Sequence, residues 1–180
     1  MTYTPAYKTL QEAFHNSRPD YGTSGRKYAD LVMNIANKIN TKDILDWGCG
    51  KATLQKSLPF PIQNYDPFIP EYSNPPRMAD FVVCTDVMEH IEPEHIDAVI
   101  QELIHLTGKI LFLQIACRPA AKILPDGRNA HLTQQPCAWW LPKFLPYLEL
   151  HSLNNTGADF IAVWGPLPKE PESEQQHDGT

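Results

Sequence analysis

The 180-residue sequence lacks several features that mark broad functional classes. No apolar run approaches the ~20 residues that a membrane-spanning helix requires, and the first residues lack the basic and apolar regions of a signal peptide. No basic run suggests a track for a phosphate backbone and the net charge is −6, so a nucleic-acid partner is not favoured. The four cysteines are scattered without a C-x-x-C pair, which predicts free thiols, no zinc and a cytoplasmic location.

A missing glycine argues against a dinucleotide-binding site. Residues 44–50 read Ile-Leu-Asp-Trp-Gly-Cys-Gly, an apolar strand that ends in Asp46 and in the glycines Gly48 and Gly50. These glycines allow the backbone to turn sharply and to approach a ligand closely. The dinucleotide fingerprint G-x-G-x-x-G needs a third glycine, which is absent because the next one is Gly108.

Two acids also distinguish a site for a cofactor with a pyrophosphate from a site for a cofactor without phosphate. Asp46 would repel the pyrophosphate of NAD but would attract an ammonium group. Asp66 ends a short run twenty positions later, where it can accept hydrogen bonds from both hydroxyls of a ribose. S-adenosylmethionine carries an ammonium, a sulfonium and a ribose but no phosphate, so these residues favour it over NAD. A turn without a ligand would leave both acids unexplained.

These residues resemble the motifs of the class I S-adenosylmethionine-dependent methyltransferases. The first motif of that family looks like Leu45–Gly50, its ribose-binding acid corresponds to Asp66, and its post-strand motif resembles Thr85–Ile91. The resemblance, which runs from about residue 26 to about residue 165, implies a methyltransferase with a Rossmann-like three-layer α/β sandwich. It also implies a mostly parallel sheet with an antiparallel C-terminal hairpin. The cofactor-binding residues that we expect are Asp46, Gly48, Cys49, Gly50, Asp66, Pro67, Phe68, Thr85 and Asp86.

The segment after Asp66 departs from the family pattern. Relatives usually place another helix and strand before the next motif, but here a short proline-rich stretch leads directly to an apolar run at 81–84. Proline neither donates to a β-ladder nor fits inside a helix, so we expect the third strand–helix unit to be missing. The loop that often contacts adenine in relatives is lost with it, and we expect Pro67, Phe68 or residues 78–80 to take its place.

Hydrophobic periodicity predicts the other elements of a single domain over residues 1–165. Helices within residues 1–40 should pack on the core, and a helix over 51–58 should follow the glycine turn. The remaining predictions are a helix beginning at Pro93, a strand at 110–115, a hairpin of 147–152 with 160–164, and a disordered acidic tail at 166–180.

Candidate catalytic residues follow the central strand. Asp86, Glu89 and His90 come directly after it, beside the expected sulfonium, and the irregular segment 116–135 places His131 at the same edge of the sheet. Methyl transfer to a hydroxyl needs a group that removes a proton. His90 is the natural base because its unperturbed pKa lies near neutrality, and Asp86 or Glu89 would orient it. The alternative without chemistry is that Glu89 caps a loop and His90 packs beside the cofactor.

A metal site is a further alternative. The order Asp86-x-x-Glu89-His90 resembles the acid-x-x-Glu-His pattern of the small-RNA 3′-end 2′-O-methyltransferases and of the ubiquinone-pathway O-methyltransferases. In the RNA enzymes a later histidine completes the metal site, and His131 lies where such a ligand could come from. A divalent ion would lower the pKa of a substrate hydroxyl. The chain departs from both patterns at Asp86, which is one methylene shorter than their glutamate.

The methyl acceptor that we expect is a hydroxyl of a small molecule or sugar-type compound. The alternatives are an RNA end or modified nucleobase, and a protein that binds S-adenosylmethionine without turnover. The titratable groups beside the sulfonium argue against the non-catalytic alternative, since simple binding does not need them. The sequence does not predict an oligomeric state.

Overall fold

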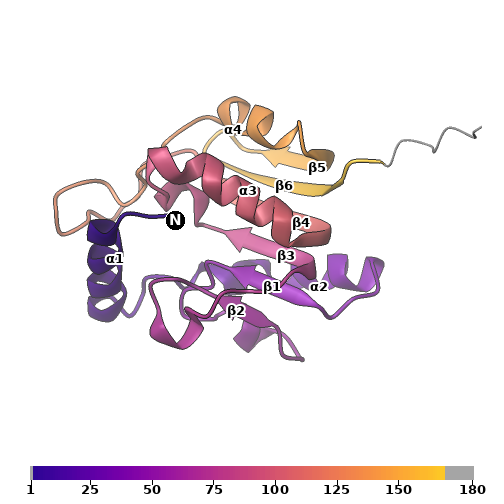
Figure 1. The fold of residues 1–180 in the computed structure, drawn as a ribbon, viewed down its shortest axis with the longest axis horizontal. Coiled ribbons are helices and arrows are strands. Elements are labelled where there is room, and N and C mark those ends of the chain that lie inside the picture. Colours follow the sequence, from indigo (N-terminus) through magenta and orange to yellow (C-terminus); the bar gives the residue numbers. More distant parts are fainter. Residues whose placement is uncertain (1, 169–180) are drawn as a thin grey trace, which may run out of the picture.

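A single sheet runs through the residues that the computed structural model describes, which are 2–168. The strands are β1 (Ile44–Trp47), β2 (Gln63–Tyr65), β3 (Ala79–Thr85), β4 (Thr107–Ala116), β5 (Leu148–Asn155) and β6 (Asp159–Pro166). Their order in the six-stranded sheet is β2-β1-β3-β4-β6-β5 (Figure 1). The strands from β2 to β4 are parallel, whereas β6 is antiparallel to β4 and β5. The predicted α/β fold, with its mostly parallel sheet and C-terminal hairpin, is therefore confirmed.

Helices cover both faces of the sheet. On one face α2 (Ala29–Lys38) packs with Phe81, and on the other α3 (Ile96–Leu106) packs with Val82. Adjacent residues of a strand point to opposite faces, so the continuous buried run of β3 contributes to two cores. The helix α4 (Cys137–Phe144) packs into the same core as α3, which crosses in front of the strands in Figure 1.

The chain passes from β2 to β3 without another strand or α-helix, which confirms the predicted loss of a strand–helix unit. β2 is consequently an edge strand of the sheet. The connecting segment contains one turn of 3₁₀ helix, Pro70–Tyr72, and the N–H of Asp66 donates to the carbonyl of Tyr72 at 3.0 Å. This bond folds the segment back onto the end of β2.

The helix predicted over 51–58 is wrong. Only one turn of 3₁₀ helix, Gln55–Ser57, forms there. Lys51 donates its N–H to the carbonyl of Gly22 at 2.8 Å, and Ala52 has a φ of +52°, a left-handed conformation that interrupts a helix. The glycine turn is therefore followed by a tight loop and not by a helix N-terminus.

The two N-terminal helices occupy different places. α2 covers the sheet as predicted, whereas α1 (Pro5–Ser17) stands beyond the carboxyl ends of the strands, beside the loop that follows β4 (Figure 1). Tyr7 and Phe14 of α1 pack with Leu124 and Ala130 of that loop. α1 thus forms a wall across the end of the sheet.

Three other sequence predictions concern membrane-spanning helices, the pairing of the cysteines and the C-terminal tail. Within residues 2–168, none of the helices is both long and apolar enough to cross a membrane. The four cysteines are unpaired. The predicted tail over 166–180 lies outside the described residues from position 169 onward.

A backbone contact between Gly22 and Gly50 fixes the loop before α2 onto the glycine turn. Gly50 has a φ of +52°, and a Cβ atom at this position would overlap with the carbonyl group of Gly22. The same carbonyl accepts the N–H of Lys51. The two segments therefore touch through backbone atoms, which only glycine at position 50 permits.

We expect Gly50→Ala to destabilise the protein by about 2–4 kcal/mol, because a backbone overlap is added to the strain of a left-handed alanine. The matched control is Gly157→Ala, since Gly157 also has a positive φ (+85°) but nothing within 4 Å of an added Cβ. Its loss should be about 1–2 kcal/mol, from strain alone. Urea denaturation measures both, and an equal loss in the two variants would contradict a role for the contact.

Candidate active site

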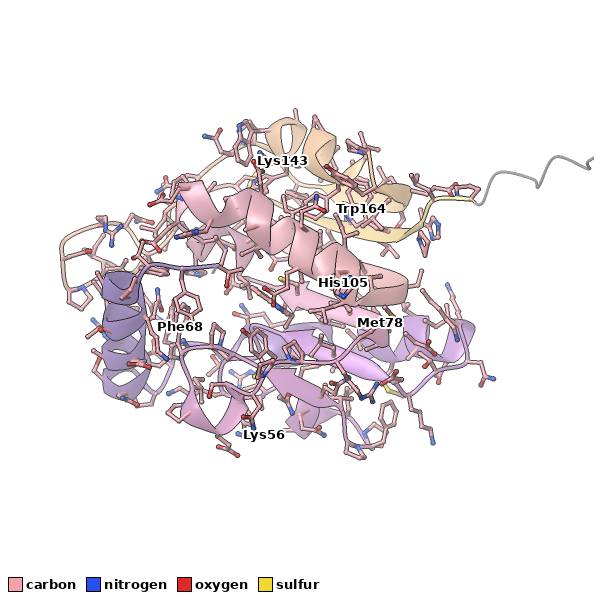
Figure 2. The ribbon with its side chains drawn as sticks, in the orientation of Figure 1. Lys56, Phe68, Met78, His105, Lys143 and Trp164 are labelled. Atoms are coloured by element: carbon pink, nitrogen blue, oxygen red, sulfur yellow. The ribbon has the colours of Figure 1, made fainter. Side chains whose placement is uncertain are left out.

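A cavity of about 330 Å³ lies at the carboxyl ends of β1, β2 and β3. All the residues predicted to hold the cofactor line this cavity, as do His90 and His131, whereas Glu89 lies behind its wall. Residues 78–80 do not line it, so this part of the adenine prediction is wrong. The reason is that β3 begins at Ala79, which places Met78 at the opposite end of the sheet from Phe68 (Figure 2).

Asp66 ties the turn after β1 to the turn after β2. Its Oδ2 accepts the N–H of Gly50 at 3.1 Å, and its Oδ1 accepts the N–H of Phe68 at 2.9 Å. Burial raises the pKa of Asp66 to about 6, although both hydrogen bonds act in the opposite direction. Each oxygen keeps further acceptor capacity, so this fixed carboxylate can receive hydroxyl groups of a ligand in the cavity.

Asp46 is the more isolated of the two acids. It is 2% exposed, and its Oδ2 has no hydrogen-bond partner within residues 2–168. Burial raises the pKa of Asp46 to about 7, and the negative charge of Asp66 adds to the rise. A buried carboxyl group without a partner costs free energy, so a ligand that donates a hydrogen bond or a positive charge would stabilise it.

Asp86 directly follows β3 and has a left-handed backbone conformation. Its φ of +60° is costly for a residue with a side chain, and such strain concentrates at functional sites. Ser24 donates its hydroxyl to Oδ2 at 2.6 Å, and the N–H of Asp86 donates to the carbonyl of Gln114 at 3.1 Å. Burial acts to raise the pKa of Asp86, but the hydrogen bond from Ser24 and its other polar neighbours hold it below the usual value. Asp86 is therefore ionised at neutral pH.

Glu89 approaches the same place from inside the protein. Its side chain is fully buried, and Oε1 accepts the N–H of Ala116 at 2.9 Å. Its Oε2 has no hydrogen-bond partner in the described part of the chain. Burial raises the pKa of Glu89 well above its ordinary value, and the charge of Asp86 raises it further.

The two histidines are held in the same tautomer. Nδ1 of His90 lies 2.7 Å from the carbonyl oxygen of Ala130, and Nδ1 of His131 lies 2.6 Å from that of Arg118. A carbonyl only accepts, so each Nδ1 carries a proton, and Nε2 of a neutral ring keeps the lone pair. The rings meet edge to face with centroids 4.8 Å apart. Burial, with a contribution from His131, lowers the pKa of His90 to about 4, so this ring is neutral at pH 7.

The predicted catalytic residues therefore converge in space. Asp86, Glu89 and His131 each offer one ligand atom to a metal ion, and these atoms lie within 4.8 Å of one another. His90 lies outside this set, but its ring contacts that of His131. Two arrangements of the same residues are thus available, one with a histidine base and one with a metal ion.

Sequence reasoning missed the polar groups that α1 and the following loop contribute to the cavity. Tyr7 donates to the carbonyl of His90 at 2.6 Å, Gln11 donates to the hydroxyl of Tyr7 at 2.5 Å, and Tyr21 donates to Gln11 at 3.2 Å. These three residues and His15 line the cavity. The only available signal was Gln11, a polar residue one helical turn after Tyr7 on the buried face of α1.

Several solved structures share this fold. The DhpI protein in complex with S-adenosylhomocysteine (SAH) is 12% identical with a TM-score of 0.56, over 90% of this chain and 98% of that one. The 1,6-didemethyltoxoflavin-N1-methyltransferase of Burkholderia thailandensis, with 1,6-didemethyltoxoflavin and SAH bound, is 8% identical with a TM-score of 0.60, over 89% of each chain. Magnesium protoporphyrin IX methyltransferase of Synechocystis PCC 6803 with bound SAH is 14% identical with a TM-score of 0.54, over 78% of this chain and 83% of that one.

The similarity lies in the structure and not in the sequence. No protein-family model matches this sequence, and no curated protein matches it. At identities of 8% to 14% the likeness establishes the fold alone. The chain has the Rossmann-like fold of the class I S-adenosylmethionine-dependent methyltransferases.

We expect Asp46→Asn to stabilise the ligand-free protein at pH 8 and to change its stability little at pH 4. The pKa of Asp46 in the folded protein, about 7, lies above its value in the unfolded chain. The folded wild type therefore holds a proton between these two values and loses stability as the pH rises through them. The gain for the variant at pH 8 is on the order of 4 kcal/mol. Urea denaturation at both pH values measures it, and a variant that is no more stable at pH 8 would contradict the buried charge.

Proposed function

We propose that this protein is an S-adenosylmethionine-dependent methyltransferase whose cofactor occupies the cavity at the ends of β1 and β2. The observation that carries the proposal is the pair of buried acids, Asp46 with an unpartnered oxygen and Asp66 fixed by two backbone N–H groups. The ammonium of the cofactor would pair with Asp46, and the ribose hydroxyls would donate to Asp66. A cofactor with a pyrophosphate would be repelled by Asp46.

An aromatic group beside Asp66 offers a place for adenine. Phe68 packs edge to face with Tyr3 and Tyr7, with ring centroids 5.1 Å and 5.8 Å away, and Pro67 lines the cavity next to it. Figure 2 shows Phe68 beside α1, at the end of the sheet. These rings supply the apolar surface on which a purine stacks.

The compared structures support this cofactor and a small acceptor. Three of them hold SAH, the demethylated product of S-adenosylmethionine, on the same fold. Two are named for small-molecule acceptors, a toxoflavin precursor and a magnesium porphyrin. By analogy, we infer that a small molecule also accepts the methyl group here.

The acceptor atom that the site suits best is a hydroxyl oxygen of a small molecule or sugar-type compound. This oxygen bonds to the methyl carbon while the carbon–sulfur bond breaks, and the sulfur keeps the electron pair and becomes a neutral thioether. The hydroxyl proton passes to Nε2 of His90, which is free because Nδ1 holds the proton of the ring. The ionised Asp86 stabilises the imidazolium that forms.

A divalent metal ion is the second candidate for activating the hydroxyl. The ligand atoms of Asp86, Glu89 and His131 are close enough to share one ion, and Oε2 of Glu89 lacks a partner within residues 2–168. Two carboxylates and one imidazole suit Mn²⁺, and carboxylates suit Mg²⁺. A bound ion would lower the pKa of the acceptor hydroxyl, whereas His90, with a pKa of about 4, is a weak base.

Calorimetric titration with S-adenosylmethionine and SAH tests the cofactor. We expect the wild type to bind both compounds and Asp66→Asn to lose at least about tenfold in affinity, because an amide nitrogen cannot accept a ribose hydroxyl. The matched control is Asp43→Asn, since Asp43 pairs with Arg77 (2.8 Å) at the amino end of the strands. If folded wild-type protein produces no heat with either compound, the proposal is refuted.

Histidine variants test the chemistry. We expect His90→Ala and His131→Ala to keep SAH binding but to form SAH from S-adenosylmethionine at least about 100-fold more slowly with hydroxylated acceptors. Unchanged turnover in both variants would remove the two residues from the mechanism. Binding without turnover of any acceptor would favour a non-catalytic protein.

Titration with Mn²⁺, followed by electron paramagnetic resonance, separates the two candidates. A metal site requires that His131→Ala and Glu89→Gln weaken Mn²⁺ binding, whereas His105→Ala does not, because His105 lies at the far end of α3 (Figure 2). Wild-type turnover that is independent of Mn²⁺ and Mg²⁺ would leave His90 as the base.

A further inference from the structure

A second hollow, of about 280 Å³, adjoins the cofactor cavity. Asp86, Lys27 and Arg118 line both spaces, so the two meet at the end of β3. The second hollow continues past Gln114 of β4 to the tip of the hairpin at Thr156. A molecule in this hollow would therefore present one end to Asp86, where the methyl group of the cofactor is expected.

Two cations stand where the spaces meet. Lys27 is exposed and forms no ion pair within the described part of the chain. Arg118 is half-exposed, and its Nη2 lies 3.4 Å from Oδ1 of Asp159, which is long for a charge-assisted hydrogen bond. Asp86, the other acid of the hollow, accepts the hydroxyl of Ser24, keeps its negative charge and forms no ion pair with either cation within residues 2–168. A carboxylate or phosphate would find one free and one weakly paired cation.

Gln114 adds an unpartnered acceptor to the wall of this hollow. The residue is 4% exposed, and its Oε1 has no hydrogen-bond donor within residues 2–168. Tyr28 stands on the same wall, and burial raises the pKa of its hydroxyl to about 12, so that this group stays protonated. A ligand with a hydrogen-bond donor would satisfy the buried amide oxygen, which otherwise costs free energy.

We propose that this hollow binds the methyl acceptor, and that the acceptor is a small hydroxylated anion, either a carboxylate or a phosphate monoester. Lys27 and Arg118 pair with its acid, Gln114 accepts from one of its donors, and the hydroxyl to be methylated lies beside Asp86. The acid takes no part in the reaction and fixes the orientation of the acceptor. The inference rests on the proposed methyltransferase function and narrows its substrate class.

The test is titration of SAH-saturated, ¹⁵N-labelled protein with matched probes, followed by amide chemical shifts. The probes are 3-hydroxybenzoate with its uncharged match 3-hydroxybenzamide, and a hexose 6-phosphate with the free hexose. We expect at least one acid to bind about tenfold more tightly than its match, with shifts concentrated at Lys27, Gln114 and Arg118. The pair that shows the difference tells a carboxylate site from a phosphate site.

Variants identify the residues responsible. The double variant Lys27→Gln with Arg118→Gln should abolish the preference for the acid, whereas Lys109→Gln with Arg77→Gln should not. In the control pair, Lys109 and Arg77 each pair with an acid at the amino end of the strands. Gln114→Leu should weaken acid and neutral probe equally, because it removes a hydrogen bond and not a charge.

Three outcomes would overturn the inference: no binding of any acid at millimolar concentration, equal affinity for acid and neutral probe, or shifts that map elsewhere. SAH titration of the same samples reports on the proposed function separately. Protein that binds an acid in this hollow but does not bind SAH would refute the methyltransferase and leave the anion site.

Discussion

One buried carboxylate, that of Asp66, holds the candidate site together. It joins the turn after β1 to the turn after β2 by accepting the N–H groups of Gly50 and Phe68. Because both donors belong to the backbone, the spacing of the two turns does not depend on side-chain rotamers. The oxygens that fix the turns also line the cavity. The residue that fixes the two turns is therefore also part of the cavity wall.

The other acids of the site continue this electrostatic arrangement. Burial raises the pKa values of Asp46, Asp66 and Glu89, whereas Asp86 is kept ionised with the help of the hydroxyl of Ser24. Without a ligand, the raised values represent a cost that the two apolar cores must offset. A ligand that brings an ammonium and hydroxyl groups would remove part of this cost, so occupancy of the cavity and stability of the fold are linked.

The sequence was sufficient for features that depend on local pattern, and insufficient for those that depend on distant contacts. The strands, the glycine turn and the positions of Asp46 and Asp66 at the cavity were readable from alternation, spacing and residue type. The absence of a helix after Gly50 was not, because it depends on the bond from Lys51 to Gly22 and on the left-handed Ala52. The second hollow was equally invisible, since it forms only when the hairpin pairs with β4.

The half of the sheet with β1 and β2 has few helices, so other segments form the wall of the candidate site there. With no helix directly after β1 and no strand–helix unit after β2, α1 and the loop after β4 supply the wall at that edge. α1 is bound to the segment 90–92, because Tyr7 donates to the carbonyl of His90 and Thr4 donates both its N–H and its hydroxyl to Glu92 at 2.8 Å. A displacement of α1 that preserves these bonds must carry His90 with it. The position of α1, whose residues line the cavity, and the position of the candidate base His90 are therefore coupled.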